Sequence, residues 1–592
     1  MSRLFGRLGG LGLSLALITG LGLGPAGPAP ASAAGPTPAA AGETTRIPAA
    51  ARETARTPAA AGEAARTPAQ AVAAMQPGWN LGNTFDATGD DETSWGNPRV
   101  TPELLDGIRA QGFKSIRIPV TWGQHQGPGP DWTIDPAYLS RVKEVVGWAL
   151  DDGFHVMLNV HHDSWQWINN MPVDHDTVLA RFNAIWSQVA PAFRDASPRL
   201  VLESVNEPQF TGGDPAALLA ELNASFHRIV RGSGGGNTDR LLVLPTLHTS
   251  ADQVHLDNLA AEFAALNDPH LIATVHYYGY WPFSVNVAGG YRFDATAQQD
   301  LIDMFTRIHT TLVARGVPVV IGEYGLLGFD RHTGTIEQGE KLKFFELFGR
   351  QARVRGVATM LWDNGQHFDR TSLAWRDPEL FGQIRSSWTT RSGTAATDLV
   401  FVSRSAPVTA QTITLNLNGT GFTQIRLGAS TLRRGPDYQI SGDRLTLTAG
   451  LLTRLTQPPG YGVTASLSLR FSRGVPWRLD VIATDRPVLS AATGSTTSFA
   501  VPAAFNGDRL ATMTAIYPDG SNAGPHGWTP YKEYDRAFAP DHAAGTIRLT
   551  PDFFAEVTDA TPVTLRFHFW SGEIVTYQLT RSGTTVTGTP IA

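Results

Sequence analysis

The chain has 592 residues, of which 42% are apolar and 17% are charged, and its net charge at pH 7 is -6. This length allows about three to four domains, and so small a net charge gives no reason to expect a nucleic acid partner. The sequence contains no cysteine, which excludes disulfides, thiol nucleophiles and cysteine-ligated metals. Stability must therefore come from the size of the apolar core.

The first 33 residues have the pattern of a secretory signal peptide. Arg3 and Arg7 precede an apolar, Gly/Leu-rich run from Leu8 to Leu23, and the small residues Ala31-Ser32-Ala33 suit signal peptidase cleavage. We therefore expect residues 1–33 to be removed and the protein to be secreted, extracellular and without a membrane partner. An N-terminal membrane anchor is the alternative.

Residues 34–70 are rich in Ala, Pro and Thr. They contain a degenerate ten-residue repeat, in which Arg46, Arg56 and Arg66 each begin an Arg-x-Pro-Ala sequence. Such a segment has almost nothing to bury, so an extended, disordered linker is expected.

Apolar runs alternate with segments of helical periodicity between residues 71 and 387. In residues 136–150, for example, Val142, Val146 and Leu150 recur at helical spacing. Eight strand-then-helix units predict an α/β fold, the (β/α)8 TIM barrel. The expected strands are 78–81, 115–118, 156–160, 200–202, 241–244, 272–276, 319–322 and 359–362.

Polar and aromatic side chains gather where these strands end, the side of a TIM barrel that carries the chemistry. Glu207 follows the fourth strand and Glu323 ends the seventh. Two carboxyl groups are what glycosidic hydrolysis requires, because one protonates the leaving oxygen while the other attacks the sugar or activates water. The other candidates at strand ends are Arg117, His161, His162, Asn206, His276, Tyr278 and Trp362.

The helical pattern stops near residue 387, and short alternating strands follow. Residues 388–486 are typical of an immunoglobulin-like β-sandwich, and residues 487–592 form a further β-rich unit. The second unit ends in a hairpin in which Leu565 and Phe567 share one face and Trp570 lies on the other. The face with Trp570 should meet solvent unless another part of the protein covers it.

Seven short motifs of residues 71–385 are similar to those of one enzyme family. They are Trp79 to Asn83, Arg117 to Val120, Asn159 to Asp163, Asn206 to Pro208, His276 to Tyr278, Ile321 to Gly325 and Trp362 to Gly365. Together they resemble glycoside hydrolase family 5, and most closely its subfamily 4 endoglucanases and xyloglucanases. The two β-rich units resemble the X2 module and the family 46 carbohydrate-binding module of bacterial family 5 enzymes.

This resemblance implies a retaining endo-β-1,4-glucanase that acts on cellulose-type glucan, mixed-linkage β-glucan or xyloglucan. A polysaccharide partner, no cofactor, no metal and a monomer are expected. Glu207 would be the acid/base, with a raised pKa that keeps it protonated. Glu323 would be the nucleophile, kept ionised by Arg117 and Tyr278.

The resemblance also implies roles for the neighbouring residues. Asn206 would donate to the sugar 2-hydroxyl, His276 would hydrogen-bond the acid/base region, and His161 would contact the sugar or the nucleophile. Trp362 would be a sugar platform. Further substrate contacts are expected from His162, Asn83 and Trp281, and stacking in the last unit from Trp528, Tyr531, Tyr534 and Trp570, with packing in a core as the alternative for these aromatic side chains.

A metal cluster of His161, His162 and Asp163 is disfavoured, because adjacent residues of a strand point to opposite faces. Glu203, close to Asn206, is expected to be structural.

Three other functions remain open. A β-mannanase would use the same barrel and the same two glutamates. A non-catalytic carbohydrate-binding protein would lack one of them, and neither is missing. A metal-dependent TIM-barrel hydrolase would lose its activity to a chelator.

Overall fold

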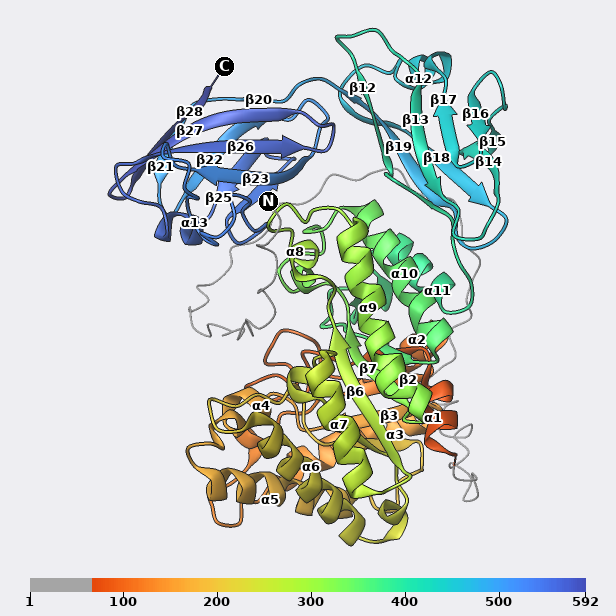
Figure 1. Cartoon of the computed structure of the whole chain (residues 1–592), viewed down its shortest axis with the longest axis vertical. Coiled ribbons are helices and arrows are strands. Elements are labelled where there is room, and N and C mark those ends of the chain that lie inside the picture. Colours follow the sequence, from red (N-terminus) through yellow and green to blue (C-terminus); the bar gives the residue numbers. More distant parts are fainter. Residues whose placement is uncertain (1–65, 592) are drawn as a thin grey trace, which may run out of the picture. The chain divides into compact units, whose positions relative to one another are not determined.

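The computed structural model describes residues 66–591. Within them eight parallel strands close into a barrel in chain order (Figure 1), which confirms the predicted TIM barrel. The strands are β1 (Gly78–Asn80), β2 (Ser115–Ile118), β3 (His155–Asn159), β4 (Leu200–Glu203), β5 (Leu242–Pro245), β6 (Leu271–Tyr277), β7 (Val319–Tyr324) and β8 (Ala358–Leu361).

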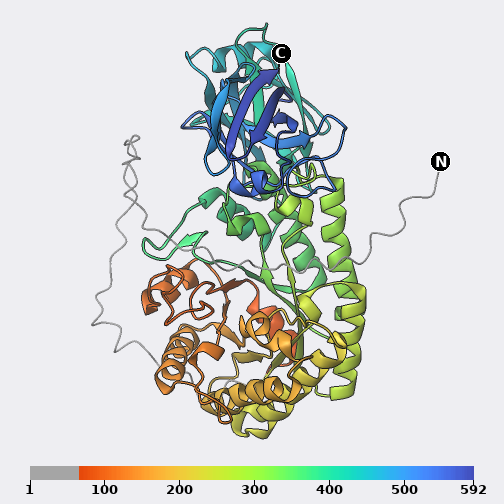
Figure 2. The same ribbon diagram turned by 90° about the vertical axis from the view of Figure 1, so that its left-hand side faces the viewer.

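Helices surround the strands of the barrel (Figures 1 and 2). Several begin with a capping side chain followed by proline, which satisfies free N–H groups and presets the first turn; in one of them Asp135 caps and Pro136 opens the helix. Among the helices described, none is long and apolar enough to cross a membrane. The longer ones are α2 (Pro102–Ala110), α3 (Pro136–Asp151), α5 (His175–Phe193), α6 (Pro215–Gly232), α7 (Gln253–Leu266), α9 (Ala295–Thr311), α10 (Gln338–Arg355) and α11 (Pro378–Ser387), and the short α4 (Asp163–Gln166) and α8 (Trp281–Ser284) lie in loops.

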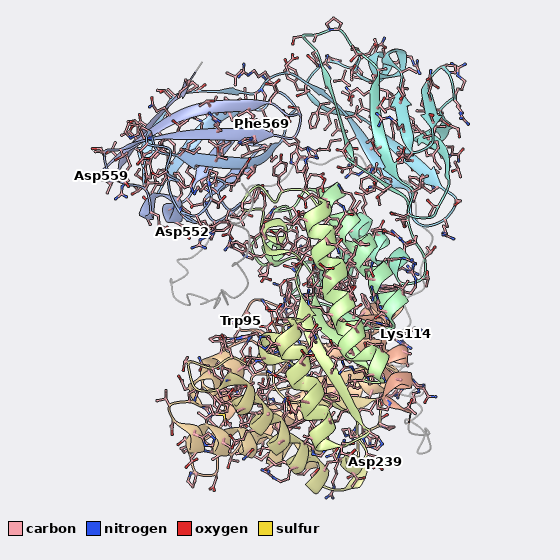
Figure 3. All side chains as sticks on the ribbon, in the orientation of Figure 1. Trp95, Lys114, Asp239, Asp552, Asp559 and Phe569 are labelled. Atoms are coloured by element: carbon pink, nitrogen blue, oxygen red, sulfur yellow. The ribbon has the colours of Figure 1, made fainter. Side chains whose placement is uncertain are left out.

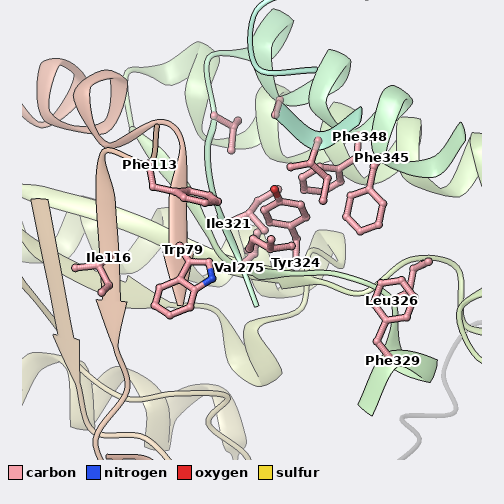
Figure 4. Packing of buried hydrophobic residues seen from close by; sticks show 14 of the residues in the cluster. Trp79, Phe113, Ile116, Val275, Ile321, Tyr324, Leu326, Phe329, Phe345 and Phe348 are labelled. Atoms are coloured by element: carbon pink, nitrogen blue, oxygen red, sulfur yellow. The ribbon is translucent and has the colours of Figure 1, made fainter. Parts of the chain in front are cut away.

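Strands β3 to β8 each contribute to two apolar clusters by alternation. In β4, Leu200 and Leu202 join the large cluster between strands and helices, whereas Val201 joins a smaller one. Figure 4 shows part of the large cluster, with Trp79 and Ile321 among its members. Since each large apolar side chain buried in this way contributes about 1.5–3 kcal/mol, the strand ends are held in fixed positions.

The expectation of a disordered linker up to residue 70 is wrong at its end. Helix α1 (Pro68–Met75) starts inside it, opened by a capping box between Thr67 and Gln70. Ala71, Val72 and Met75 of this helix are buried in the smaller cluster, so they belong to the barrel. The rest of the linker and the expected signal peptide lie outside the described residues.

Two β-sandwich units follow the barrel, as predicted. The first contains the sheets β11-β13-β17-β16 and β12-β19-β18-β14-β15, and the second contains β20-β22-β25-β24 and β21-β28-β27-β26-β23. The first unit comprises β11 (Thr394–Ala395), β12 (Leu399–Ser403), β13 (Gln411–Asn416), β14 (Phe422–Leu427), β15 (Ser430–Thr431), β16 (Tyr438–Ser441), β17 (Arg444–Leu447), α12 (Ala449–Leu455), β18 (Gly462–Phe471) and β19 (Trp477–Thr484).

The second unit contains the hairpin expected from its alternating pattern. Its turn joins β26 (Pro562–Phe569) to β27 (Ile574–Ser582), and Leu565 and Phe567 are buried on one face. The other elements of this unit are β20 (Val488–Leu489), β21 (Ala492–Ser495), β22 (Phe499–Ala504), β23 (Leu510–Ile516), β24 (Phe538–Asp541), β25 (Thr546–Leu549), α13 (Pro551–Ala555) and β28 (Thr585–Ile591). We call this second unit the terminal module.

Candidate active site

Arg117, at the end of β2, joins the strand ends into one buried network. Its Nε donates to Glu203 at 2.8 Å, and its two terminal nitrogens donate to Glu323 at 2.6 Å and to Asn206 at 2.8 Å. Burial acts to lower the pKa of Arg117, but the charges of Glu203 and Glu323 outweigh it and raise that pKa. Glu203 also accepts from Asn159 at 2.9 Å, which gives it the structural role that was expected.

Glu323 is almost fully buried and is held by two donors. Arg117 occupies Oε1, and the hydroxyl of Tyr278 donates to Oε2 at 2.6 Å. Burial and the charge of Glu323 raise the pKa of Tyr278 well above its ordinary value, so its hydroxyl keeps the proton that it donates. Both oxygens of Glu323 therefore accept a hydrogen bond from the protein, which fixes the orientation of this carboxyl group.

Glu207 lies directly after β4 in a backbone conformation that side chains rarely adopt, with φ of +40°. Its side chain is 44% exposed, and its Oε1 lies 2.9 Å from Nδ1 of His276. Partial burial acts to raise the pKa of Glu207, but the hydrogen bond and the charge of His276 lower it by more. The pKa of Glu207 is therefore below its ordinary value. The expected raised pKa is therefore wrong for the substrate-free protein.

His276 brings the two glutamates together. The same Nδ1 that contacts Glu207 lies 3.5 Å from Oε2 of Glu323. One oxygen of each carboxylate and the His276 nitrogen all lie within 4.8 Å of one another. A register shift between β6 and β7 falls at His276, so the alternation of a regular strand does not by itself explain how it reaches this position.

Aromatic rings line the other side of the site. The ring of Trp362 lies parallel to that of His161 at 5.9 Å, and His161 meets His162 at 4.4 Å. A Cβ on Gly82 would lie 2.9 Å from the Trp362 ring, so only glycine fits beneath it. Asn83 follows with φ of +52°.

The argument that placed the two histidines on opposite faces is wrong. His161 and His162 follow the last residue of β3, and their nitrogens gather with a carboxylate oxygen of Asp86 within 4.8 Å. Trp165 donates to Nδ1 of His162 at 2.8 Å, and Asp86 accepts from two backbone N–H groups. Burial lowers the pKa of His161 far below its usual value, so its ring is neutral. The hydrogen bonds to His162 and Asp86 fix the positions of these two side chains.

Asp163, the third member of the suspected metal cluster, points elsewhere. It is buried and accepts from the backbone of Trp122 at 2.8 Å and of Gly123 at 2.7 Å, and from Trp167 at 2.8 Å. These contacts fix the loop after β2.

Asp330 follows β7, and no motif of the sequence assigns it a role. The structure leaves it exposed to solvent, yet desolvation by the surrounding loop and the charges of Glu323 and Glu207 raise its pKa to about 7. Its chemistry could not be read from a motif, because it depends on which carboxylates the fold brings near it.

The terminal module meets the barrel at the loops after β6 and β7. Trp281 lies 5.9 Å from Trp528, measured between ring centroids, and Arg331 forms an ion pair with Glu533. Trp528 is 62% exposed. The module thus places a solvent-facing indole beside the loop that carries Trp281.

Three other candidates for sugar stacking have protein neighbours. Trp570 meets Tyr291 at 5.4 Å and the guanidinium of Arg292 at 4.7 Å. The ring of Tyr531 lies so close to Gly289 that a Cβ there would be 3.4 Å away. The remaining candidate, Tyr534, is partly buried against the core of the module. Barrel residues therefore cover Trp570, whose face was expected to meet solvent only if no other part of the protein covered it.

Three regions of the chain match known families. The cellulase family, glycosyl hydrolase family 5, matches residues 80–368. Carbohydrate binding domain X2 matches residues 394–481, and the carbohydrate binding domain CBM46 matches residues 485–589.

Known relatives match most of the length of the chain. Endoglucanase B of Paenibacillus lautus is 54% identical over 525 residues, which cover 88% of this chain and 93% of that protein. The structure of the full-length tri-modular endo-β-1,4-glucanase B from Bacillus halodurans is 47% identical, with a TM-score of 0.87, and covers 89% of this chain and 100% of that one. That of a tri-modular family 5, subfamily 4 endo-β-1,4-glucanase from Bacillus licheniformis is 32% identical, with a TM-score of 0.75 and the same coverage of 89% and 100%. The chain therefore belongs to glycosyl hydrolase family 5, the cellulase family, as its barrel motifs predicted.

Proposed function

We propose that the protein is a secreted endo-β-1,4-glucanase that hydrolyses its substrate with retention, using Glu207 as acid/base and Glu323 as nucleophile. The observation that carries this proposal is the approach of the two carboxylates to one His276 nitrogen, with all three atoms within 4.8 Å. Retaining enzymes hold their carboxyl groups about 5–5.5 Å apart, and inverting enzymes about 6.5–9.5 Å apart. The short distance supports retention.

The proposed reaction has two displacements. In the first, Glu323 attacks the anomeric carbon while Glu207 gives its proton to the glycosidic oxygen, so that the C–O bond breaks and a glycosyl ester of Glu323 forms. In the second, Glu207 takes a proton from water, the water oxygen attacks the anomeric carbon, and Glu323 leaves.

The low pKa of Glu207 in the free protein constrains the first step. Glu207 is 44% exposed, so a bound glucan would remove water from it and disfavour its charged form. We propose that substrate binding, rather than the free site, brings Glu207 to the protonated state that the reaction needs.

Neighbouring groups have complementary roles in this proposal. Arg117 and Tyr278 hold the two oxygens of Glu323 in place for attack on the sugar. Because Oδ1 of Asn206 accepts from Arg117, its amide N–H groups remain available to donate to the sugar 2-hydroxyl. Trp362 and His161 supply ring surface beside the nucleophile.

The proposed substrates are cellulose-type glucans, mixed-linkage β-glucan and xyloglucan. The pair Trp281 and Trp528 supports a binding surface to which both the barrel and the terminal module contribute. We propose domain boundaries at 71–387 for the barrel, 388–486 for the X2-like unit and 487–592 for the terminal module, with α1 added to the barrel. Secretion rests on the sequence pattern of residues 1–33.

The two roles can be separated by rescue with azide. Glu323→Ala should abolish hydrolysis, and azide should restore turnover of an activated glycoside with an α-glycosyl azide as product. Glu207→Ala should lower hydrolysis of an unactivated glucan by about 10²–10⁴-fold. With azide and an activated glycoside, this variant should give the β-glycosyl azide. If each variant yields the other anomer, the acid and the nucleophile have been exchanged.

A further inference from the structure

The first β-sandwich unit carries a net charge opposite to that of the rest of the chain. Residues 388–486 contain eleven arginines and five aspartates but no lysine, histidine or glutamate, so their net charge at pH 7 is +6. The whole chain has a net charge of -6, so the residues outside this unit carry -12. Because net charge decides which partners a surface attracts rather than how a chain folds, this unit is suited to an anionic partner.

Ion pairs compensate fewer than half of these arginines. Arg391 pairs with Glu346, and Arg478 pairs with Glu379 and Asp480. Three further arginines have a carboxylate partner, namely Arg433, Arg454 and Arg486. Within residues 66–591 the other six form no ion pair, and they are Arg404, Arg426, Arg434, Arg444, Arg470 and Arg473.

Two of these six arginines are neighbours on one face of a sheet. In the sheet β12-β19-β18-β14-β15 (Figure 1), Arg426 of β14 is paired with Ser468 of β18, and Arg470 comes two residues after Ser468. Since paired residues and residues two apart along a strand point to the same face, Arg426 and Arg470 are diagonal neighbours. Their face lies away from the core, because Ile425 and Leu469, which alternate with them, are buried in the large apolar cluster.

The guanidinium groups of Arg426 and Arg470 are held at the sheet without a counter-charge. Both side chains are partly buried, and Nε of each is buried with no hydrogen-bond partner in the described part of the chain. Arg426 donates from Nη2 to the backbone oxygen of Ala429 at 2.9 Å. A cation that is partly withdrawn from water costs free energy unless it is paired, and two like charges on adjacent strands repel. An anion between them would relieve both costs.

Arg478 shows that the protein compensates a guanidinium on this face where the fold requires it. It is paired across the sheet with Ser468, and it forms an ion pair with Glu379 of α11. Arg478 thus serves the contact between the β-unit and the barrel. Arg426 and Arg470 meet no such carboxylate among residues 66–591, so their charges are left for a group outside the chain.

We propose that the face formed by Arg426, Arg470, Gln424 and Ser468, which we call the arginine face, binds a polysaccharide that carries carboxylate groups, as uronic acids do. A guanidinium can hold a carboxylate through two parallel N–H···O bonds. Gln424 is paired with Arg470 and Ser468 with Arg426, so an amide and a hydroxyl lie beside the guanidiniums to meet sugar hydroxyls. The arginine face would hold the enzyme on mixed polysaccharide without taking part in hydrolysis.

Affinity electrophoresis of the full chain tests this inference, with migration compared in native gels with and without polymer. Polygalacturonate should retard the wild-type protein, and salt should weaken this binding because it screens exposed charges. The double variant Arg426→Gln/Arg470→Gln should lose about tenfold in affinity, the effect of two lost exposed ion pairs. Arg426→Lys/Arg470→Lys, which keeps the charge but not the paired hydrogen bonds, should lose less. Retardation by the neutral polymer hydroxyethylcellulose should be the same in all variants.

Arg434→Gln/Arg444→Gln is the matched control. It removes the same charge from two exposed arginines outside the arginine face, of which Arg444 belongs to the other sheet of the unit. Equal losses in the two Gln pairs would show attraction by net charge alone and would overturn the inference, as would binding of double-stranded DNA as tight as that of polygalacturonate. Melting temperature and kcat/KM on hydroxyethylcellulose report whether the fold is intact, and the Lys pair decides if the Gln pair is not folded. An inactive wild-type enzyme would refute the proposed function but leave the binding result valid.

Discussion

At the scale of single residues, the two glutamates differ in the donors around them. Glu323 is buried between Arg117 and Tyr278, whereas Glu207 retains solvent contact and is held by His276. Two carboxylates in one site can perform different steps when their surroundings separate their proton affinities. The proposed role of Glu207 as acid/base therefore depends on its contact with His276.

The pH profile of kcat/KM tests this dependence. Activity should fall as pH rises through the pKa of Glu207, because the proposed acid must be protonated. Since His276 lowers that pKa, His276→Phe should move the alkaline limb to higher pH while kcat falls. Tyr278→Phe, which removes a donor from Glu323 only, should leave the alkaline limb in place. A limb that stays or moves to lower pH in His276→Phe would contradict the assignment.

At the scale of elements, the start of α10 meets the first β-sandwich unit through two buried carboxyl groups. Glu337 caps α10 by accepting from the N–H groups of Gly339 and Glu340, and Asp398 lies so close that a Cβ on Gly339 would be 2.5 Å from its Oδ1. Both oxygens of Asp398 and Oε1 of Glu337 are buried and accept no hydrogen bond from another group of the described residues. A proton shared between Glu337 and Asp398 would satisfy them.

The stability of this junction should depend on pH. Burial raises the pKa of Asp398 to about 6, although the charge of Arg478 acts to lower it. Burial and the charge of Asp398 raise the pKa of Glu337 well above its ordinary value. The charge of Glu340 acts to raise both pKa values. A raised pKa in the folded state contributes stability that is fully present at pH below about 4, the pKa of an unfolded Asp, and is lost as pH rises through about 6.

Thermal unfolding between pH 4 and 7 tests this junction. The melting temperature of Asp398→Asn should depend less on pH than that of the wild type, because the amide stays neutral. Asp239→Asn, on an exposed residue labelled in Figure 3, is the control and should follow the wild type. Parallel curves for Asp398→Asn and the wild type would show that the two carboxyl groups share no proton.

The elements of the barrel could be predicted because each strand is a short apolar run with a turn signal. The candidate site could be predicted because its polar residues lie at the ends of these strands. Helix α1 was missed because its Ala-rich sequence resembles the linker, although Thr67 and Gln70 form a capping box. The exposure of Trp570 could not be predicted, because the sequence of a hairpin does not show which residues cover its face.

At the scale of the whole molecule, the barrel and the β-units are joined by packing and polar contacts. The large apolar cluster of the barrel continues into Ala395 and Val400 of the first β-unit. The terminal module adds hydrogen bonds from Tyr534 N–H to the backbone oxygen of Asn286 at 3.1 Å and from the Asn286 side chain to Ala511 at 3.0 Å. The module is thus more than a tethered binding domain.

Two tryptophans of the terminal module should therefore behave differently. Trp528→Ala removes an exposed indole beside Trp281, and should lower activity on xyloglucan or mixed-linkage β-glucan by a few-fold to about tenfold without changing the melting temperature. Trp570→Ala removes a contact with Tyr291 and Arg292, and should weaken the docking of the module and lower its unfolding temperature. Equal effects of the two variants would contradict this division.

The stereochemistry of the first product tests the central claim most directly, because it depends on the distance between Glu207 and Glu323 and on their roles. Proton NMR during hydrolysis of a cello-oligosaccharide would record the anomeric signal before mutarotation. The proposed double displacement predicts that the β-anomer appears first. An initial α-anomer would mean inversion, and would contradict the assignment of Glu323 as the nucleophile.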